Sequence, residues 1–161
     1  MKDPISVGLG ERLVSRDPDE ILVAYGLGSC LGIGMIDPVA RVCGLLHAVL
    51  PIKNNGTDPF NPKFVDSGIN GLIDEMTKNG ATRNRLVIRM AGGANMLTAP
   101  GLSKTFDIGA RNIDSAHEVF QSLRMDLKSE DVGGTRGRTV RLYVGQGRMT
   151  VRVIGEKEMD L

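Results

Sequence analysis

The sequence predicts an α+β fold for one domain that spans residues 1–161. The length fits one domain that buries about two thirds of its unfolded surface, and no linker divides the chain. Strand-like segments outnumber helix-like ones, and the two kinds do not alternate strictly, which is unlike a doubly wound parallel sheet.

Seven segments have the pattern of strands, bounded by turn-forming residues. A short hairpin is expected between the last two, because Gly145-Gln146-Gly147 joins them. The seven are Ile5–Leu9, Ile21–Tyr25, Leu31–Ile36, Val42–Leu50, Leu86–Ala91, Thr139–Val144 and Met149–Ile154.

Two segments have apolar side chains at helical spacing. The first is expected to begin at Pro62 behind an Asn61 cap and to stop at Gly80. The second is expected from Ile113 to Arg124, with Asn112 as its cap. The apolar stripes are Val65, Ile69, Leu72, Ile73 and Met76 in the first, and Ile113, Ala116, Phe120 and Leu123 in the second.

The composition excludes several classes of function. The formal net charge is +1 and the chain has no Trp, 2 Tyr and 4 Phe, so neither a basic nucleic-acid face nor a base-stacking platform is expected. No apolar run approaches the ~20 residues of a membrane helix, and the N-terminus Met1–Pro4 does not resemble a signal peptide. A cytoplasmic protein without membrane insertion is the expectation.

The most informative region is Gly26–Pro51, where a turn at Asp37–Ala40 separates two strand-like runs. If Ile36 pairs with Arg41, Cys30 lies directly opposite His47. Directly opposed residues have Cβ atoms roughly 4.5–5.5 Å apart, close enough for a thiol and an imidazole to form a hydrogen bond. Such pairing would lower the thiol pKa, and backbone N–H groups of the Gly26–Ser29 turn would face a developing oxyanion.

Cys30 also has a structural interpretation, because a cysteine on a strand is ordinarily a core residue. Its opposition to one of only 2 histidines makes the two interpretations equally supported. Cys43 is expected to be structural, and His117 to lie on the solvated side of the second helix. A zinc site is excluded because Cys43 and His47 lie ~13 Å apart along one strand, and the same geometry excludes a Cys30–Cys43 disulfide.

Motifs along nearly the whole chain resemble the CheD family of chemoreceptor glutamine deamidases. The combination of a Gly-Ser-Cys turn, a following His-containing strand and two glycine-rich motifs is specific. The matching segments are Gly26–Cys30, Asp37–Ala40, Leu46–Pro51, Ala91–Met96, Ile108–Asn112 and Asp131–Gly134.

The resemblance implies a layered, β-sandwich-like core flanked by helices, and a cytoplasmic cysteine hydrolase. Such an enzyme is a protein-glutamine glutaminase: it deamidates glutamine side chains of methyl-accepting chemotaxis receptors through a thioester, releases ammonia and needs no metal or organic cofactor. Cys30 matches the family nucleophile and His47 its base. The backbone N–H groups of Cys30 and Ser29 are the implied oxyanion donors.

One position departs from the family pattern. The family has a threonine six residues before the nucleophile, where this chain has Ala24. Ala24 has no hydroxyl to orient the imidazole, so a backbone carbonyl near Ala24 is expected to take that role. The Tyr25 hydroxyl is a weaker candidate, because Tyr25 points to the opposite face of a regular strand.

The resemblance also implies chemoreceptor cytoplasmic domains and the CheC phosphatase as partners. It therefore leaves an alternative function, an adaptor that binds receptors and CheC with weak or no deamidase activity. The binding residues would then lie in the glycine-rich segment and beside it: Gly92, Gly93, Asn95, Arg111 and Asn112. From loop behaviour alone, the same segment is equally well interpreted as a mobile loop that packs on the sheet edge.

Overall fold

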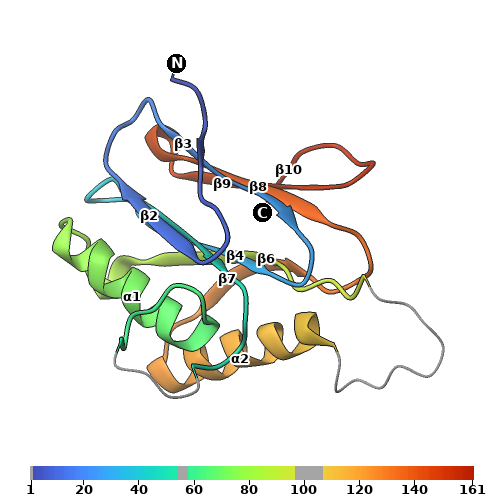
Figure 1. Cartoon of the computed structure of the whole chain (residues 1–161). Helices are drawn as coiled ribbons and strands as arrows, with labels where there is room; N and C mark the ends of the chain where they lie inside the picture. Colours follow the sequence, from blue (N-terminus) through green and yellow to red (C-terminus); the bar gives the residue numbers. More distant parts are fainter. Residues whose placement is uncertain (1, 54–57, 97–106) are drawn as a thin grey trace.

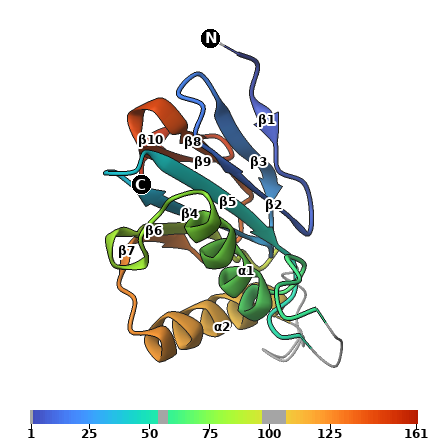
Figure 2. The same ribbon diagram turned by 90° about the vertical axis from the view of Figure 1, so that its left-hand side faces the viewer.

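Two five-stranded sheets pack face to face, and two helices cover the outer face of one of them (Figures 1 and 2). This arrangement comes from a computed structural model, which describes residues 2–53, 58–96 and 107–161. The layers are therefore helices, sheet and sheet, and the predicted α+β class with a sandwich-like core is confirmed.

The sheet without helices has the order β1-β3-β8-β9-β10. Strand β1 runs parallel to β3, whereas the other neighbours are antiparallel. The predicted hairpin joins β8 and β9 through a short 3-10 turn at Val144–Gln146. The strands are β1 (Ile5–Ser6), β3 (Ile21–Leu27), β8 (Arg138–Tyr143), β9 (Arg148–Val153) and β10 (Met159–Asp160).

The second sheet has the order β2-β5-β4-β6-β7, in which only β6 and β7 pair in parallel. Strand β3 of the first sheet leads directly into β4 of the second through Gly28–Cys30, so the chain changes sheets at this turn. The strands are β2 (Glu11–Ser15), β4 (Leu31–Asp37), β5 (Val42–Ala48), β6 (Val87–Gly92) and β7 (Leu127–Val132).

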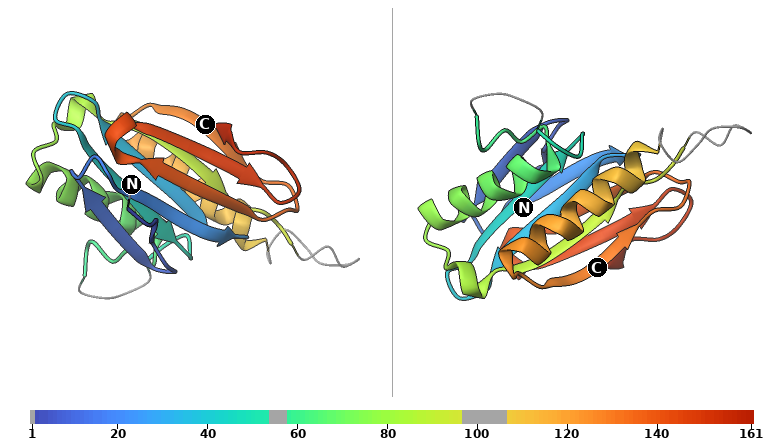
Figure 3. Two further views of the ribbon diagram at one scale, coloured as in Figure 1. Left: turned by 90° about the horizontal axis from the view of Figure 1, so that it is seen from above. Right: turned by 90° about the horizontal axis from the view of Figure 1, so that it is seen from below.

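Helices α1 (Val65–Lys78) and α2 (Ile108–Leu123) lie side by side on the second sheet (Figure 3). Their apolar stripes pack on one face of β4, β5 and β6, and the opposite face of these strands packs on the first sheet. Because both faces of β4 and β5 are covered, every residue of these two strands is buried. The second core lies between the sheets and includes Val7, Ala24, Leu27, Cys30, Cys43, Leu45, Val140 and Met149.

The seven predicted strands are all present, but β2, β7 and β10 were not expected. Strand β7, with the sequence LKSEDV, is polar and lies at a sheet edge, so it has no apolar run to identify it. Strand β10 has only two residues. Their strand conformation depends on pairing with a neighbour rather than on their own sequence.

Both helices begin elsewhere than predicted. Helix α1 starts at Val65, because the Asn61 side chain accepts the Lys63 N–H at 3.0 Å and forms a turn before the helix. Helix α2 starts at Ile108, capped by Asp107, whose carboxylate accepts the Ala110 N–H at 2.9 Å. Asn112 is therefore not a cap but an interior residue of α2.

The predicted register of the β4–β5 hairpin is wrong by two residues. Asp37 pairs with Val42, which places Gly32 rather than Cys30 opposite His47. The turn has four residues, as expected, but it begins one residue later, at Pro38, and the Asp37 carboxylate accepts the N–H groups of both Val39 and Ala40 at 3.0 Å. A shift of two keeps side chains on their original face, so Cys30 and His47 still share one.

Replacing Asp37 with asparagine is expected to lower the free energy of unfolding by about 2–3 kcal/mol at pH 7. Asp37 is fully buried and accepts from the Thr82 N–H at 2.8 Å and from the Arg85 guanidinium at 3.0 Å. Burial alone would raise its pKa, but these hydrogen bonds outweigh burial and hold the pKa well below its usual range.

Urea denaturation measures this effect. Because the folded pKa of Asp37 lies below the unfolded value of 3.8, the stabilisation is present at neutral pH and is lost as the pH falls below about 4. Asp74→Asn, which removes an exposed pair with Lys78, is the control and should cost under about 0.5 kcal/mol. Equal effects of the two substitutions at pH 7 would contradict the assignment.

Candidate active site

Cys30 lies at the turn where the chain passes from one sheet to the other. The residue is 8% exposed and belongs to the apolar cluster between the sheets, together with Ala24 and Leu45. The thiol is therefore close to the surface without being open to bulk solvent.

Three consecutive backbone carbonyls around this thiol are anchored. The Gly28 carbonyl accepts the Ala94 N–H at 2.8 Å, and the Cys30 carbonyl accepts the Gly93 N–H at 2.9 Å. Between them, the Ser29 carbonyl accepts the side-chain amide of Asn112 at 2.8 Å. Among the described residues, no hydrogen bond uses the Ser29 N–H, and the Cys30 N–H interacts with its own thiol.

His47 is held by its Nδ1 atom, which lies 2.9 Å from the backbone carbonyl of Val7. A carbonyl only accepts, so Nδ1 carries the proton and Nε2 has a free lone pair. Nε2 is buried and has no hydrogen-bond partner among the described residues. Burial lowers the pKa of His47, and the bond to Val7 offsets this only in part, so the imidazole is neutral at pH 7.

The carbonyl that orients His47 comes from the segment after β1 and not from the strand of Ala24. The two segments are neighbours, since the Val7 N–H donates to the Val23 carbonyl at 2.8 Å. Ala24 itself is fully buried between the sheets, whereas Tyr25 is half exposed, with its ring 5.9 Å from the Arg141 guanidinium. The orienting group is therefore a backbone atom, which leaves no trace in the sequence.

Cys30 and His47 lie diagonally across β4 and β5, not directly opposite. A diagonal pair is separated by roughly 7 Å between Cβ atoms. No hydrogen bond joins the two side chains, and burial raises the pKa of the Cys30 thiol, which its own backbone N–H offsets only in part. The expected lowering of the thiol pKa is thus not found, and the resting pair is a neutral thiol and a neutral imidazole.

Gly32 and Gly92 make this close packing possible. A Cβ at Gly32, opposite His47, would lie 2.9 Å from the Val140 side chain of the other sheet. A Cβ at Gly92 would lie 2.1 Å from the Cys30 carbonyl oxygen, and Gly92 has a φ of +119°. Both positions therefore need glycine for steric reasons.

The residues expected to form a binding surface are mostly internal. Gly92, Gly93 and Asn112 are buried, Asn95 is partly buried and only Arg111 is exposed. Gly92, Gly93 and Asn112 support the turn of Cys30 and are not free to contact a partner. The expected segment also includes residues 97–106, which lie outside the described part of the chain.

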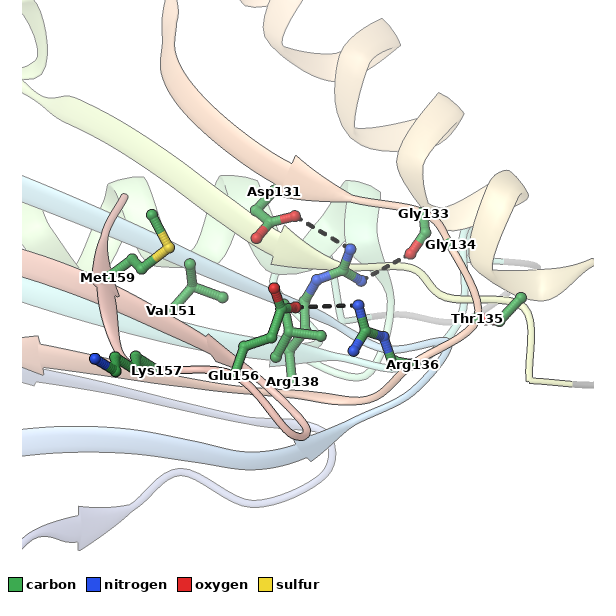
Figure 4. Close-up of a pocket in the computed structure, with 11 residues that line it drawn as sticks. Asp131, Gly133, Gly134, Thr135, Arg136, Arg138, Val151, Glu156, Lys157 and Met159 are labelled. Atoms are coloured by element: carbon green, nitrogen blue, oxygen red, sulfur yellow. Dashed lines mark hydrogen bonds and ion pairs between the residues drawn. The ribbon is translucent and has the colours of Figure 1, made fainter.

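Arg138 forms hydrogen bonds with the backbone of the glycine-rich segment that packs against Cys30. Its guanidinium donates to the Gly133 carbonyl at 2.8 Å and pairs with Asp131 at 3.2 Å (Figure 4). It also donates to the Gly92 carbonyl at 3.1 Å. The pocket drawn in Figure 4 lies beside this arginine and is not lined by Cys30 or His47. Sequence reasoning missed both Arg138 and Val7 as contributors to the site.

The second cysteine and the second histidine do not join the site. Cys43 is 1% exposed, and burial raises the pKa of its thiol to about 12. Its Sγ lies 3.8 Å from the Val144 carbonyl, which agrees with a structural role. His117 is exposed on α2, where its Nε2 lies 2.7 Å from Glu130.

Sequence comparison with known proteins identifies relatives of this chain. The family model described as CheD chemotactic sensory transduction matches residues 49–153. Cys30 and His47 lie before this match, but longer alignments extend over nearly the whole chain. Among the described residues, no helix is long and apolar enough to cross a membrane.

Three curated relatives illustrate these alignments. A probable chemoreceptor glutamine deamidase CheD of Symbiobacterium thermophilum is 40% identical and covers 97% of this chain and 96% of its own. A probable chemoreceptor glutamine deamidase CheD of Caldanaerobacter subterraneus is 43% identical, covering 94% and 93%. The chemoreceptor glutamine deamidase CheD of Thermotoga maritima is 36% identical, also covering 94% and 93%.

Proposed function

The chain belongs to the CheD family, and we propose that it deamidates selected glutamine side chains of chemoreceptors through Cys30 and His47. The observation that supports these residues best is the free Nε2 of His47. This nitrogen is buried and unprotonated, because the proton of the neutral imidazole lies on Nδ1, and it has no partner among the described residues. His47 also lies on the same face of the sheet as the Cys30 thiol. The curated relatives are named as deamidases, so the adaptor alternative is not favoured.

The reaction begins with both catalytic groups neutral. Nε2 of His47 takes the proton of the Cys30 thiol as the sulfur attacks the carboxamide carbon of the glutamine. The imidazolium then gives this proton to the leaving nitrogen, and ammonia departs from a thioester. A water molecule, deprotonated by the same Nε2, attacks the thioester, which releases glutamate and the Cys30 thiol.

The backbone around Cys30 supplies the oxyanion donors. The N–H groups of Cys30 and Ser29 have no acceptor on another described residue, and the Cys30 N–H faces its own sulfur. The carbonyl oxygen of a substrate bonded to that sulfur would lie within reach of these donors. Anchoring of the neighbouring carbonyls keeps the donors in place without a cost during the reaction.

The proposed partners follow from this activity and from the family. The substrates are cytoplasmic domains of chemoreceptors, which places the enzyme in the cytoplasm. A CheC phosphatase is the second proposed partner, and its binding is measurable by titration calorimetry with purified CheC from the same organism.

Incubation with a receptor cytoplasmic fragment tests the function. Each deamidation adds about 1 Da, so peptide mass analysis should find glutamate in place of particular glutamines. Cys30→Ala, which removes the nucleophile, should abolish this conversion while leaving the fold intact, since the thiol makes no hydrogen bond that the fold needs.

The outcomes separate the enzyme from the adaptor. Conversion by the wild-type protein, with none by Cys30→Ala, supports the proposal. Equal conversion by Cys30→Ala would exclude Cys30 as the nucleophile. Absence of any conversion by the wild-type protein, with retained binding to the receptor fragment, would establish the adaptor in its place.

A further inference from the structure

One side chain of helix α2 contacts both strand ends that hold the proposed catalytic residues. Asn112 is fully buried, and its Nδ2 donates to the Ser29 carbonyl at 2.8 Å and to the Val49 carbonyl at 3.0 Å. Ser29 precedes Cys30 directly, and Val49 follows His47 by two residues. Asn112 is therefore a bridge between the two segments.

The bond to Ser29 determines the direction of the Cys30 N–H. The Ser29 carbonyl and the Cys30 N–H belong to one planar trans peptide unit and point in opposite directions. Because Asn112 holds the carbonyl toward α2, the N–H points away from the helix. The same N–H lies close enough to the Cys30 sulfur to lower the thiol pKa, and the oxyanion of an acyl group bound to that sulfur would form beside it.

The two contacts of Asn112 require a side chain that donates two hydrogen bonds. Both partners are carbonyls, so the side chain must present its NH₂ group to them, and its Oδ1 is then buried without a partner among the described residues. The unpaired oxygen offsets part of the stabilisation from the two donated bonds, whereas an apolar side chain would leave the Ser29 and Val49 carbonyls without this donor. What the side chain supplies is therefore a fixed direction for the Ser29 and Val49 carbonyls.

We propose that Asn112 is a positioning residue, which aims the Cys30 amide at the reacting carbonyl and ties the His47 strand to the same point. This inference rests on the proposed function for its effect on deamidation. Its effect on the Cys30 thiol is independent of that function.

Asn112→Ala and the larger Asn112→Leu both remove the donors, and the second also fills the space. For either variant, kcat for deamidation should fall roughly ten- to hundredfold, with little change in KM. This fall in kcat is no larger than the one that follows the loss of a direct oxyanion donor. The matched control is Ser115→Ala, one turn further along α2. Ser115 is also buried and donates to a loop carbonyl, that of Pro51 at 2.6 Å, so its loss weakens the packing of α2 without contact to Cys30 or Ser29.

A second measurement does not need the receptor. The pH dependence of Cys30 alkylation by iodoacetamide, followed by peptide mass analysis, reports the thiol pKa. Misdirection of the Cys30 N–H removes a group that stabilises the thiolate, so the alkylation midpoint should move to higher pH in both Asn112 variants and not in Ser115→Ala.

The outcomes distinguish this inference from the proposed function. A shifted alkylation profile in the Asn112 variants supports positioning, whether or not the wild-type protein deamidates receptors. An unshifted profile, or a fall in kcat that matches the Ser115→Ala control, would overturn it. If the wild-type protein deamidates nothing, the proposed function fails, and the alkylation profile still decides the role of Asn112.

Discussion

Replacing His47 with glutamine is expected to slow receptor deamidation by roughly a thousandfold or more. Glutamine has no basic nitrogen, so nothing in the variant takes the Cys30 proton or returns it to ammonia. Loss of the bond to Val7 should cost only about 1 kcal/mol of stability, and the variant should remain folded. The rate is measured by peptide mass analysis of a receptor fragment, with circular dichroism as the check on folding.

The pH dependence of the wild-type rate tests the same role of His47. Burial places the His47 pKa below its ordinary value of 6.5, so the rate should be constant near pH 7 and fall tenfold per unit once the pH drops below that pKa. Direct alkylation of Cys30 should instead continue to rise above pH 9, because burial raises the thiol pKa above 9.0.

His117→Gln is the control, since it removes the other histidine, which lies exposed on α2 and pairs with Glu130. Its rate should stay within about twofold of the wild type. A rate for His47→Gln within tenfold of the wild type would contradict the general-base role. An alkylation profile that saturates near pH 7 would contradict the neutral resting pair.

Replacing Gly92 with alanine is expected to reduce deamidation by at least about a hundredfold and stability by roughly 3 kcal/mol. The added Cβ would lie 2.1 Å from the Cys30 carbonyl oxygen and 3.3 Å from the Leu31 Cα, so backbone must move. Movement of that carbonyl breaks its bond to the Gly93 N–H and displaces the thiol with it. Deamidation and urea denaturation measure the two effects.

Gly155→Ala separates the steric clash from backbone strain. Gly155 also has a positive φ, +86°, but a Cβ there would have nothing within 4 Å. The control should cost about 1 kcal/mol and leave the rate of deamidation unchanged. If the two alanine variants lose activity equally, the contact between Gly92 and Cys30 is not what positions the nucleophile.

The sequence by itself determined the fold class, seven strands, the approximate helices and the two candidate catalytic residues. These features depend on local patterns: apolar periodicity, glycine-rich turns, and the alternation of side chains between the two faces of a strand, which puts Cys30 and His47 on one face of a hairpin. A register error of two residues therefore left Cys30 and His47 on the same face, since side chains alternate with a period of two.

Only the tertiary structure decided how the site is held. Val7 orients His47 through a backbone carbonyl, which every residue type carries, so no sequence pattern distinguishes it. Asn112 had the signature of a helix cap, and its contacts to Ser29 and Val49 depend on where α2 packs. The raised pKa of Cys30 likewise follows from burial between two sheets, which is a property of the packed layers and not of the neighbouring residues in the chain.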